Sequence, residues 1–228
     1  MKINPDLYSF FFPRTMEVKP SDFNGKIKIV KFGNHYAAWV GGFEQSGPIV
    51  AGLWKKATDN IEMERGGKLL ILGLGCGAMV NYLAKKFPQA QIVGVEIDPV
   101  MLALGKKYFG LGKTAPLKIV NDDALSFLNN SKQAKFDLIA VDLYNGRSFD
   151  KRFTHRVFFN KLDQNLTKTG TLIFNLLTTK SSNFEPGKFL DKLAPFFVIT
   201  KKIRVNYTHT IYNTVVFCSR KKKHPDTE

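Results

Sequence analysis

Cysteine is scarce in this chain, with only two among 228 residues. Cys76 and Cys218 lie far apart and show no metal-type spacing, so neither a disulfide framework nor a metal site follows from them. Long apolar runs are absent too, since none approaches the ~20 residues needed to cross a bilayer. The first apolar run is broken by Pro13 and has no small-residue cleavage site, unlike a signal peptide. We therefore expect a cytoplasmic protein with no membrane contact.

Acidic residues are also few, with 19 Asp and Glu against 34 Lys and Arg, which gives a formal net charge of +15. A field this positive attracts nucleic acid, anionic membranes or acidic protein. A lysine-rich solvated surface without a specific partner is the alternative. We favour an acidic protein or other macromolecule as the partner over nucleic acid, and we expect the basic tail, residues 220–223, to be a solvated chain end.

Two regions of different pattern follow one another along the chain. Residues 26–32 and 35–42 flank the turn pair Gly33-Asn34 and predict a β-hairpin. Residues 53–65 have a helical pattern that stops at the glycine pair 66–67, a typical C-terminal cap. The sequence thus predicts a small β-rich module over residues 1–60 and a nucleotide-binding domain over residues 61–228.

Apolar strands and amphipathic helices alternate through the second region, which predicts a parallel sheet covered on both faces. Asp98, just before Pro99, is expected to be a helix N-cap. After a helix near 186–194, two close strands predict a terminal antiparallel hairpin. The fold class is therefore α/β, with a Rossmann-like sheet of seven strands that ends in an antiparallel hairpin. The expected strands are 68–75, 91–97, 117–121, 136–143, 170–177, 196–205 and 209–219, and the expected helices are 78–87, 99–110, 124–130 and 154–166.

The stretch LLILGLGCGAMVNYL, residues 69–83, joins a strand to a helix through a glycine loop. Residues 73–78, GLGCGA, satisfy the dinucleotide fingerprint G-x-G-x-x-G/A, with Glu96 about 20 residues further on. The same loop and acid also serve S-adenosylmethionine, whose carboxylate then faces the helix N-terminus. The loop alone therefore leaves NAD and adenosylmethionine open.

Three features favour adenosylmethionine over NAD. Asp123 follows the third strand, where a carboxylate can accept a hydrogen bond from an adenine amino group. Asp142 ends the fourth strand at the mouth of the site. The terminal hairpin is typical of the methyltransferase sheet, whereas a dehydrogenase would need a second mononucleotide-binding half or a substrate domain.

At these residues the sequence resembles the spermidine-synthase-like branch of the class I methyltransferase fold, in which a small β-domain precedes the nucleotide fold. The resemblance implies that Glu96 holds the ribose hydroxyls, that Asp123 and Ala124 flank the adenine, and that Gly73, Gly75 and Gly77 line the loop. It also implies that Gln45 reaches into the site from the β-domain. The matching segments are GFEQSG (42–47), ILGLGCGA (71–78), VGVEIDPVML (93–102), NDDALSFL (121–128), FDLIAVDLYN (136–145), FTHRVFF (153–159) and LTKTGTLIFNL (166–176).

Two departures from this family pattern bear on the reaction. The family's aminopropyltransferases carry a loop aspartate that helps hold the amine of decarboxylated adenosylmethionine, and here that position is Cys76. Their second aspartate after the fourth strand is the base, and here it is Asn145. A protonated amine cannot attack, and a base contributes about 10²–10⁴ in rate. An amide cannot accept that proton, and a +15 protein repels a polyamine unless its pocket is acidic.

We therefore favour methyl transfer from adenosylmethionine to an amine or other nucleophile of a macromolecule. The enzyme would hold the nucleophile ~3–3.5 Å from the methyl carbon. Asp142, Tyr144 and Asn145 are the candidate catalytic residues at the strand end.

Two alternatives stay open. One is a polyamine aminopropyltransferase that uses decarboxylated adenosylmethionine, and the other is an inactive nucleotide-binding module. Many relatives pair through the β-domain, so the resemblance implies a homodimer, although the residues themselves do not specify an oligomeric state.

Overall fold

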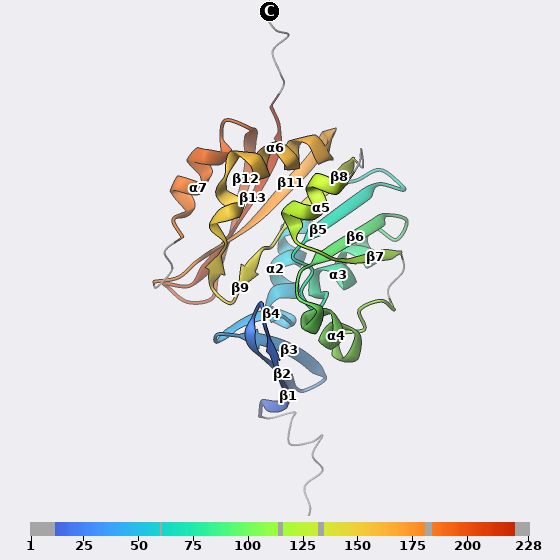
Figure 1. The fold of residues 1–228 in the computed structure, drawn as a ribbon, viewed down its shortest axis with the longest axis vertical. Coiled ribbons are helices and arrows are strands. Elements are labelled where there is room, and N and C mark those ends of the chain that lie inside the picture. The colour runs from blue at the N-terminus through green and yellow to red at the C-terminus, as the bar shows by residue number, and fades with distance from the viewer. Residues whose placement is uncertain (1–11, 60, 114–115, 132–134, 181–183, 222–228) are drawn as a thin grey trace, which may run out of the picture.

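The computed structural model describes residues 12–59, 61–113, 116–131, 135–180 and 184–221. A four-stranded sheet near the N-terminus is followed by a seven-stranded sheet with helices on its two faces (Figure 1). This architecture confirms the predicted α/β class, the terminal antiparallel hairpin and the preceding β-rich module. The boundary placed at residue 60 stays a prediction. Within the described residues, we find no helix with the length and hydropathy of a membrane span.

The N-terminal sheet contains the predicted hairpin and two further strands. Phe32 pairs with His35 across the two-residue turn, and Gly33 there has a φ of 56°. Ile27 and Ile29 are fully buried and pack in one cluster with Met101 of the nucleotide fold. The module therefore has no separate core on that face. Its strands, in sheet order, are β1 (Arg14–Ser21), β2 (Gly25–Phe32), β3 (His35–Val40) and β4 (Phe43–Ser46).

The large sheet has five neighbouring parallel strands and an antiparallel end, where β13 pairs with both β11 and β12. In sheet order the strands are β12 (Phe197–Asn206), β13 (Tyr212–Arg220), β11 (Leu166–Thr178), β8 (Phe136–Val141), β5 (Lys68–Leu72), β6 (Gln91–Glu96) and β7 (Leu117–Asn121). A short hairpin that the sequence analysis missed, β9 (Tyr144–Asn145) and β10 (Ser148–Phe149), follows β8.

The side chains of β5 divide the core into two layers, because successive residues of a strand point to opposite faces. Leu70 and Leu72 pack in one core with α5, α6 and α7, while Leu69 and Ile71 pack in another with α2 and α3. This continuous burial on both faces is what the apolar strands predicted. The helices are α2 (Pro48–Thr58), α3 (Ala78–Lys86), α4 (Pro99–Tyr108), α5 (Ala124–Asn130), α6 (Arg156–Asn165) and α7 (Pro186–Leu193), with a 3₁₀ turn η1 (Lys151–Thr154).

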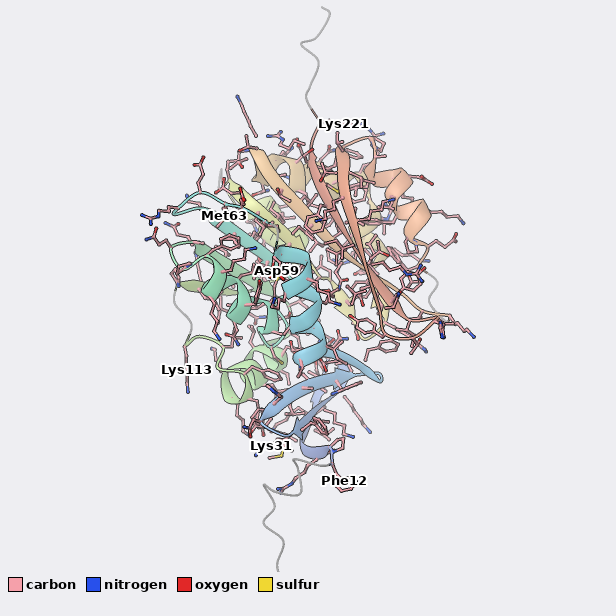
Figure 2. All side chains as sticks on the ribbon, turned by 180° about the vertical axis from the view of Figure 1, so that it is seen from behind. Phe12, Lys31, Asp59, Met63, Lys113 and Lys221 are labelled. Carbon is pink, nitrogen blue, oxygen red and sulfur yellow. The ribbon has the colours of Figure 1, made fainter. Side chains whose placement is uncertain are left out.

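The linking helix was predicted wrongly. It begins at Pro48 and ends at Thr58, whereas residues 53–65 were expected. Lys86 of α3 donates to the carbonyl oxygens of Thr58 and Asp59, so the last turn is capped by a lysine from another helix and not by the glycine pair. Seen from behind, α2 rises from the N-terminal sheet across the large one, with Asp59 at its far end (Figure 2).

Other boundaries differ by smaller amounts. The helix expected at 154–166 is a 3₁₀ turn followed by α6, and β11 begins at Leu166, before the expected residue 170. Asp98 is confirmed as the N-cap of α4, where its Oδ1 accepts a hydrogen bond from Val100 N at 2.8 Å.

Candidate functional site

A cavity of about 570 Å³ opens at the carboxyl ends of the parallel strands. Its wall combines the β1–β2 turn, β4, α2, the glycine loop, the ends of β6, β7 and β8, and the turn between β12 and β13. The volume lies within the usual range for small-molecule sites, about 300–1,000 Å³. Nine of the ten predicted site residues line it together: Gln45, Gly73, Gly75, Glu96, Asp123, Ala124, Asp142, Tyr144 and Asn145.

At Gly73 the glycine loop packs so closely on the backbone of Asp142 that no residue with a side chain would fit. Gly73 has a φ of 87°, and a Cβ built there would lie 2.1 Å from the backbone oxygen of Asp142. Gly77 also has a positive φ, 92°, but it starts α3, and its Cβ would meet Leu111. Gly77 is the predicted residue that does not line the cavity, so any contact of its own with a ligand stays a prediction.

Glu96 ends β6 and is 8% exposed. One carboxylate oxygen accepts from Gly75 N at 2.7 Å and the other from Asp98 N at 3.0 Å. Burial raises the pKa of this carboxyl, against the effect of those two hydrogen bonds. Each carboxylate oxygen has a second lone pair, so Glu96 can hold the loop and still accept from a sugar diol.

Asp123 serves both as a helix cap and as an ion-pair partner. Its Oδ1 accepts from Leu125 N at 2.9 Å and from Ser126 N at 3.1 Å, which caps α5. Its Oδ2 lies 3.1 Å from Nη2 of Arg152. An adenine amino group would therefore share Oδ2 with Arg152, and the adenine contact stays a prediction. Asp122, the other capping candidate, instead accepts from Ser126 Oγ at 3.2 Å.

Asp142 is surrounded by neutral hydrogen-bond donors. Trp54 Nε1 donates to one carboxylate oxygen at 3.1 Å, and Asn175 Nδ2 donates to the other at 2.9 Å. Asn175 in turn accepts from Asn213 Nδ2 at 2.6 Å. The surrounding protein raises the pKa of Asp142, and the two donors only partly offset this.

The sequence analysis missed Trp54, Asn175 and Asn213, which all line or adjoin the carboxylate. A signal was present for Asn175, because it interrupts the apolar run LIFNLL of β11. Trp54 carried no such signal, since it lies in a helix whose bounds were misplaced.

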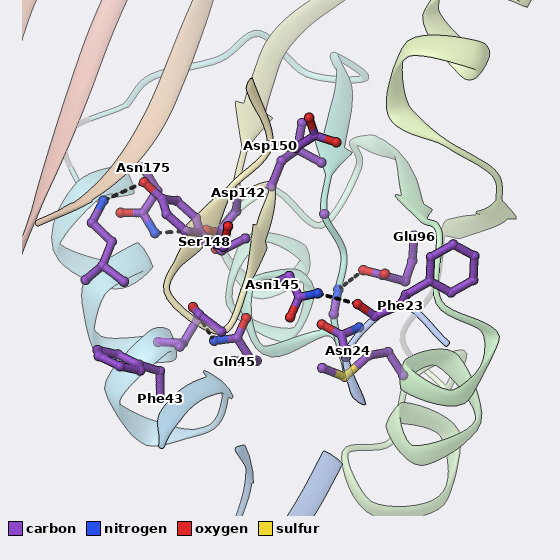
Figure 3. Close-up of a pocket in the computed structure, with 18 of the residues that line it drawn as sticks. Phe23, Asn24, Phe43, Gln45, Glu96, Asp142, Asn145, Ser148, Asp150 and Asn175 are labelled. Carbon is purple, nitrogen blue, oxygen red and sulfur yellow. Dashed lines mark hydrogen bonds between the residues drawn. The ribbon is translucent and has the colours of Figure 1, made fainter. Parts of the chain in front are cut away.

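Tyr144 and Asn145 each form a hydrogen bond with a backbone atom, and Figure 3 shows the one between Asn145 and Phe23. Tyr144 Oη accepts from Leu177 N at 2.7 Å, and burial raises the pKa of its hydroxyl. Asn145 Nδ2 donates to the carbonyl of Phe23 in the β1–β2 turn. Gln45 Nε2 donates to the carbonyl of Gly146, 3.1 Å away. A catalytic role for Tyr144 or Asn145 stays a prediction.

Cys76 lies outside the cavity. Its side chain is 0% exposed, and its Sγ is 3.6 Å from Sδ of Met101. Its backbone N–H donates to Ser46 Oγ at 2.9 Å. Burial raises the pKa of the thiol far above its ordinary value, so Cys76 is a packed neutral group and the glycine loop brings no charge to the site.

The cavity is acidic although the protein is basic. Among the described residues that line it, six are carboxylic acids and one, Arg152, is basic: the acids are Glu44, Glu96, Asp122, Asp123, Asp142 and Asp150. The expectation that the positive charge of the protein opposes a cationic substrate therefore does not extend to the site itself. A cationic amine would be attracted once inside the cavity.

Comparison with known proteins identifies the family. The family model of the spermine/spermidine synthase domain matches residues 59–226. The chain belongs to the spermine/spermidine synthase family. The predicted resemblance is thereby confirmed.

Two curated relatives of the chain are named for different activities. The chain is 30% identical over 114 residues to a polyamine aminopropyltransferase from Vibrio vulnificus, a match that covers 49% of the chain and 38% of that protein. It is 27% identical over 169 residues to an eEF1A lysine and N-terminal methyltransferase homolog from Drosophila melanogaster, covering 70% of the chain and 24% of that protein. The chain thus spans well under half the length of these two relatives.

Solved structures agree on the fold. A probable spermidine synthase from Corynebacterium glutamicum superposes with a TM-score of 0.71 at 18% identity, over 94% of this chain and 82% of that one. Human methyltransferase-like protein 13, in complex with SAH, superposes with a TM-score of 0.60 at 24% identity, over 78% of this chain and 82% of that one.

Proposed function

We propose that this spermine/spermidine synthase family member is an S-adenosylmethionine-dependent methyltransferase that acts on an amine of a macromolecular acceptor. The observation that carries this proposal is the position of Cys76. Position 76 is a cysteine whose thiol is buried against Met101, so the glycine loop offers no carboxylate that could bind the amine of decarboxylated adenosylmethionine. A ligand that still has its own carboxylate meets no opposing charge from the loop.

The residues of the cavity fit the adenosine part of such a ligand. Glu96 is fixed by two backbone N–H groups and keeps lone pairs for the ribose hydroxyls. Asp122, Asp123 and Ala124 line the cavity beyond it, where the base would lie. The glycine loop leads into the N-terminus of α3, whose dipole favours a carboxylate near that end.

The acceptor end of the cavity is suited to an amine. When bound, adenosylmethionine supplies an electrophilic methyl group on a positively charged sulfur. Asp142 is oriented by Trp54 and Asn175 and can accept a hydrogen bond or a proton from an incoming ammonium group. Glu44 and Tyr207 line the same cavity, so the amine enters among acidic and aromatic side chains.

Aminopropyl transfer is the second candidate. The acidic cavity favours a polyamine as much as a lysine side chain, and one relative is named for this reaction. Against it stand the missing loop carboxylate and the amide at position 145, which cannot take up a proton.

Calorimetry with adenosylmethionine and with its decarboxylated form separates the two candidates. We expect measurable affinity for adenosylmethionine and weaker binding of the decarboxylated form, and incorporation of tritiated methyl groups into proteins of a cell extract. A clear preference for the decarboxylated ligand, with transfer to putrescine, would overturn the proposal. Binding without turnover on any extract would favour an inactive module.

A further inference from the structure

The β9–β10 hairpin is joined to the N-terminal sheet at two points. Asn145 donates its side-chain amide to the carbonyl of Phe23, and Gln45 donates its amide to the carbonyl of Gly146. Figure 3 shows the contact between Asn145 and Phe23 as a dashed line. The hairpin follows Asp142 in the chain, so these bonds connect the acceptor end of the cavity to the β-module across 122 and 101 residues of sequence.

The β1–β2 turn, whose Phe23 carbonyl accepts from the Asn145 amide, is also held by hydrogen bonds of its own. Ser21 Oγ accepts from the backbone N–H groups of Phe23 and Asn24 at 3.1 and 3.0 Å. Ser21 Oγ and Asn24 Nδ2 donate to Oδ2 of Asp98 at 2.5 and 2.6 Å. Asp98 is 0% exposed and lies two residues after Glu96, whose carboxylate accepts from its N–H. The turn is therefore fastened to the segment that carries the ribose-binding acid.

Phe23 places this turn at the cavity. Its side chain is 43% exposed, yet it lines the cavity together with Asn24 and Asn145. The turn is bonded to Asp98 on one side and to Asn145 on the other. It therefore extends along the cavity from the segment after β6 to the β9–β10 hairpin.

We propose that Asn145 is a positioning residue that holds the β1–β2 turn across the cavity, and that it does not take part in proton transfer. The inference rests on the proposed function for the identity of the ligand, adenosylmethionine. An amide can donate to the Phe23 carbonyl, whereas an ionised aspartate has only acceptor atoms and would be repelled by it. The amide at this position, in place of the family's acid, is what makes the contact between the turn and the hairpin.

Asn145→Asp tests this, because it removes the donor with almost no change of shape. Asn160→Asp on the exposed face of α6 is the matched control, since it adds the same charge away from the cavity. We expect about tenfold weaker adenosylmethionine binding for Asn145→Asp, which corresponds to about 1.4 kcal/mol. Hydrogen exchange should rise at residues 22–24 and stay unchanged in β2 and β3. The loss should be larger in KM for adenosylmethionine than in kcat.

Two results would overturn the inference. The first is wild-type exchange at residues 22–24 in Asn145→Asp, and the second is a loss confined to kcat with the affinity unchanged. Exchange at the turn is read without any ligand. If the wild-type protein fails to bind adenosylmethionine, the proposed function fails while the exchange experiment still decides the role of Asn145.

Discussion

The carboxylate of Asp142 receives hydrogen bonds from two neutral donors, Trp54 and Asn175, and this combination explains how it can serve as a proton acceptor. Neutral donors orient the group without the strong stabilisation of the charged form that an arginine or lysine would bring. Burial therefore outweighs the two hydrogen bonds and raises the pKa of Asp142 above the ordinary aspartate value of about 3.9.

Replacing Asp142 by Asn should lower the kcat for methyl transfer by about 10²–10⁴, with a smaller effect on adenosylmethionine affinity. The raised pKa of Asp142 also predicts the acid limb of the wild-type pH–rate profile. The carboxylate must be ionised to accept a proton, so activity is lost as the pH falls through a midpoint above the ordinary aspartate value. The variant should lack that limb. Asp191→Asn, on the exposed surface of α7, should keep both the rate and the profile. An unchanged kcat in Asp142→Asn would contradict this role.

Gly73 and Gly112 provide a second comparison between single residues. Their φ values are 87° and 89°, but a Cβ at Gly73 would overlap the backbone oxygen of Asp142, whereas a Cβ at Gly112 meets nothing within 4 Å. Gly112→Ala should lower the unfolding free energy only by the strain of a left-handed alanine, about 1–2 kcal/mol. Gly73→Ala should cost more than this in unfolding free energy and should also weaken adenosylmethionine binding. Urea denaturation measures the unfolding free energy and calorimetry the affinity for adenosylmethionine. Equal effects of the two variants would contradict the role of the close contact between Gly73 and Asp142.

At the scale of elements, β1 is held to α4 by an exposed ion pair. Glu17 accepts from Lys107 Nζ at 2.8 Å and from Tyr108 Oη at 2.7 Å, and these bonds lower the pKa of Glu17 to about 2. Because the folded-state pKa is lowered, the stabilisation is present above the ordinary value of about 4.3 and is lost as the pH falls toward 2. In Lys107→Met, we expect the Glu17 pKa to rise toward its ordinary value, as measured by carbon-13 NMR titration. Lys106→Met, one residue away, should leave the Glu17 titration unchanged.

The elements also show what a sequence can predict. The Asp98 cap was predicted because its contact lies within two residues of chain. The glycine loop and Glu96 were predicted from a motif spacing of about 20 residues, which the structure realises in the hydrogen bond from Gly75 N to Glu96. Trp54, Asn213 and Phe23 were not recognised as site residues, because their partners lie 38 to 122 residues away in the sequence. The end of α2 was misplaced for the same reason, since its last carbonyl oxygens are capped by a lysine from α3.

At the scale of the whole molecule, a net charge of +15 surrounds a cavity whose described lining has six carboxylic acids and one arginine. The two charges act over different distances. The Debye length is about 8 Å at physiological ionic strength, so the positive surface governs the approach of a partner and the acidic cavity governs the last few ångströms. The acceptor that we propose, an acidic macromolecule that presents an amine, satisfies both conditions, whereas the positive surface opposes the approach of a small polyamine.

The salt dependence of the reaction should therefore reveal the kind of acceptor. For an acidic protein acceptor, kcat/KM should fall several-fold as sodium chloride is raised from about 0.05 to 0.3 M, because screening removes the long-range attraction. For a small polyamine the same screening removes a repulsion, so kcat/KM should hold steady or rise. Lys201→Glu/Lys202→Glu on the exposed part of β12 lowers the net charge and should weaken the salt dependence for the protein acceptor. Sucrose at matched osmolarity is the control for effects unrelated to charge. A kcat/KM that rises with salt for a protein acceptor would contradict electrostatic attraction between the basic surface and its partner.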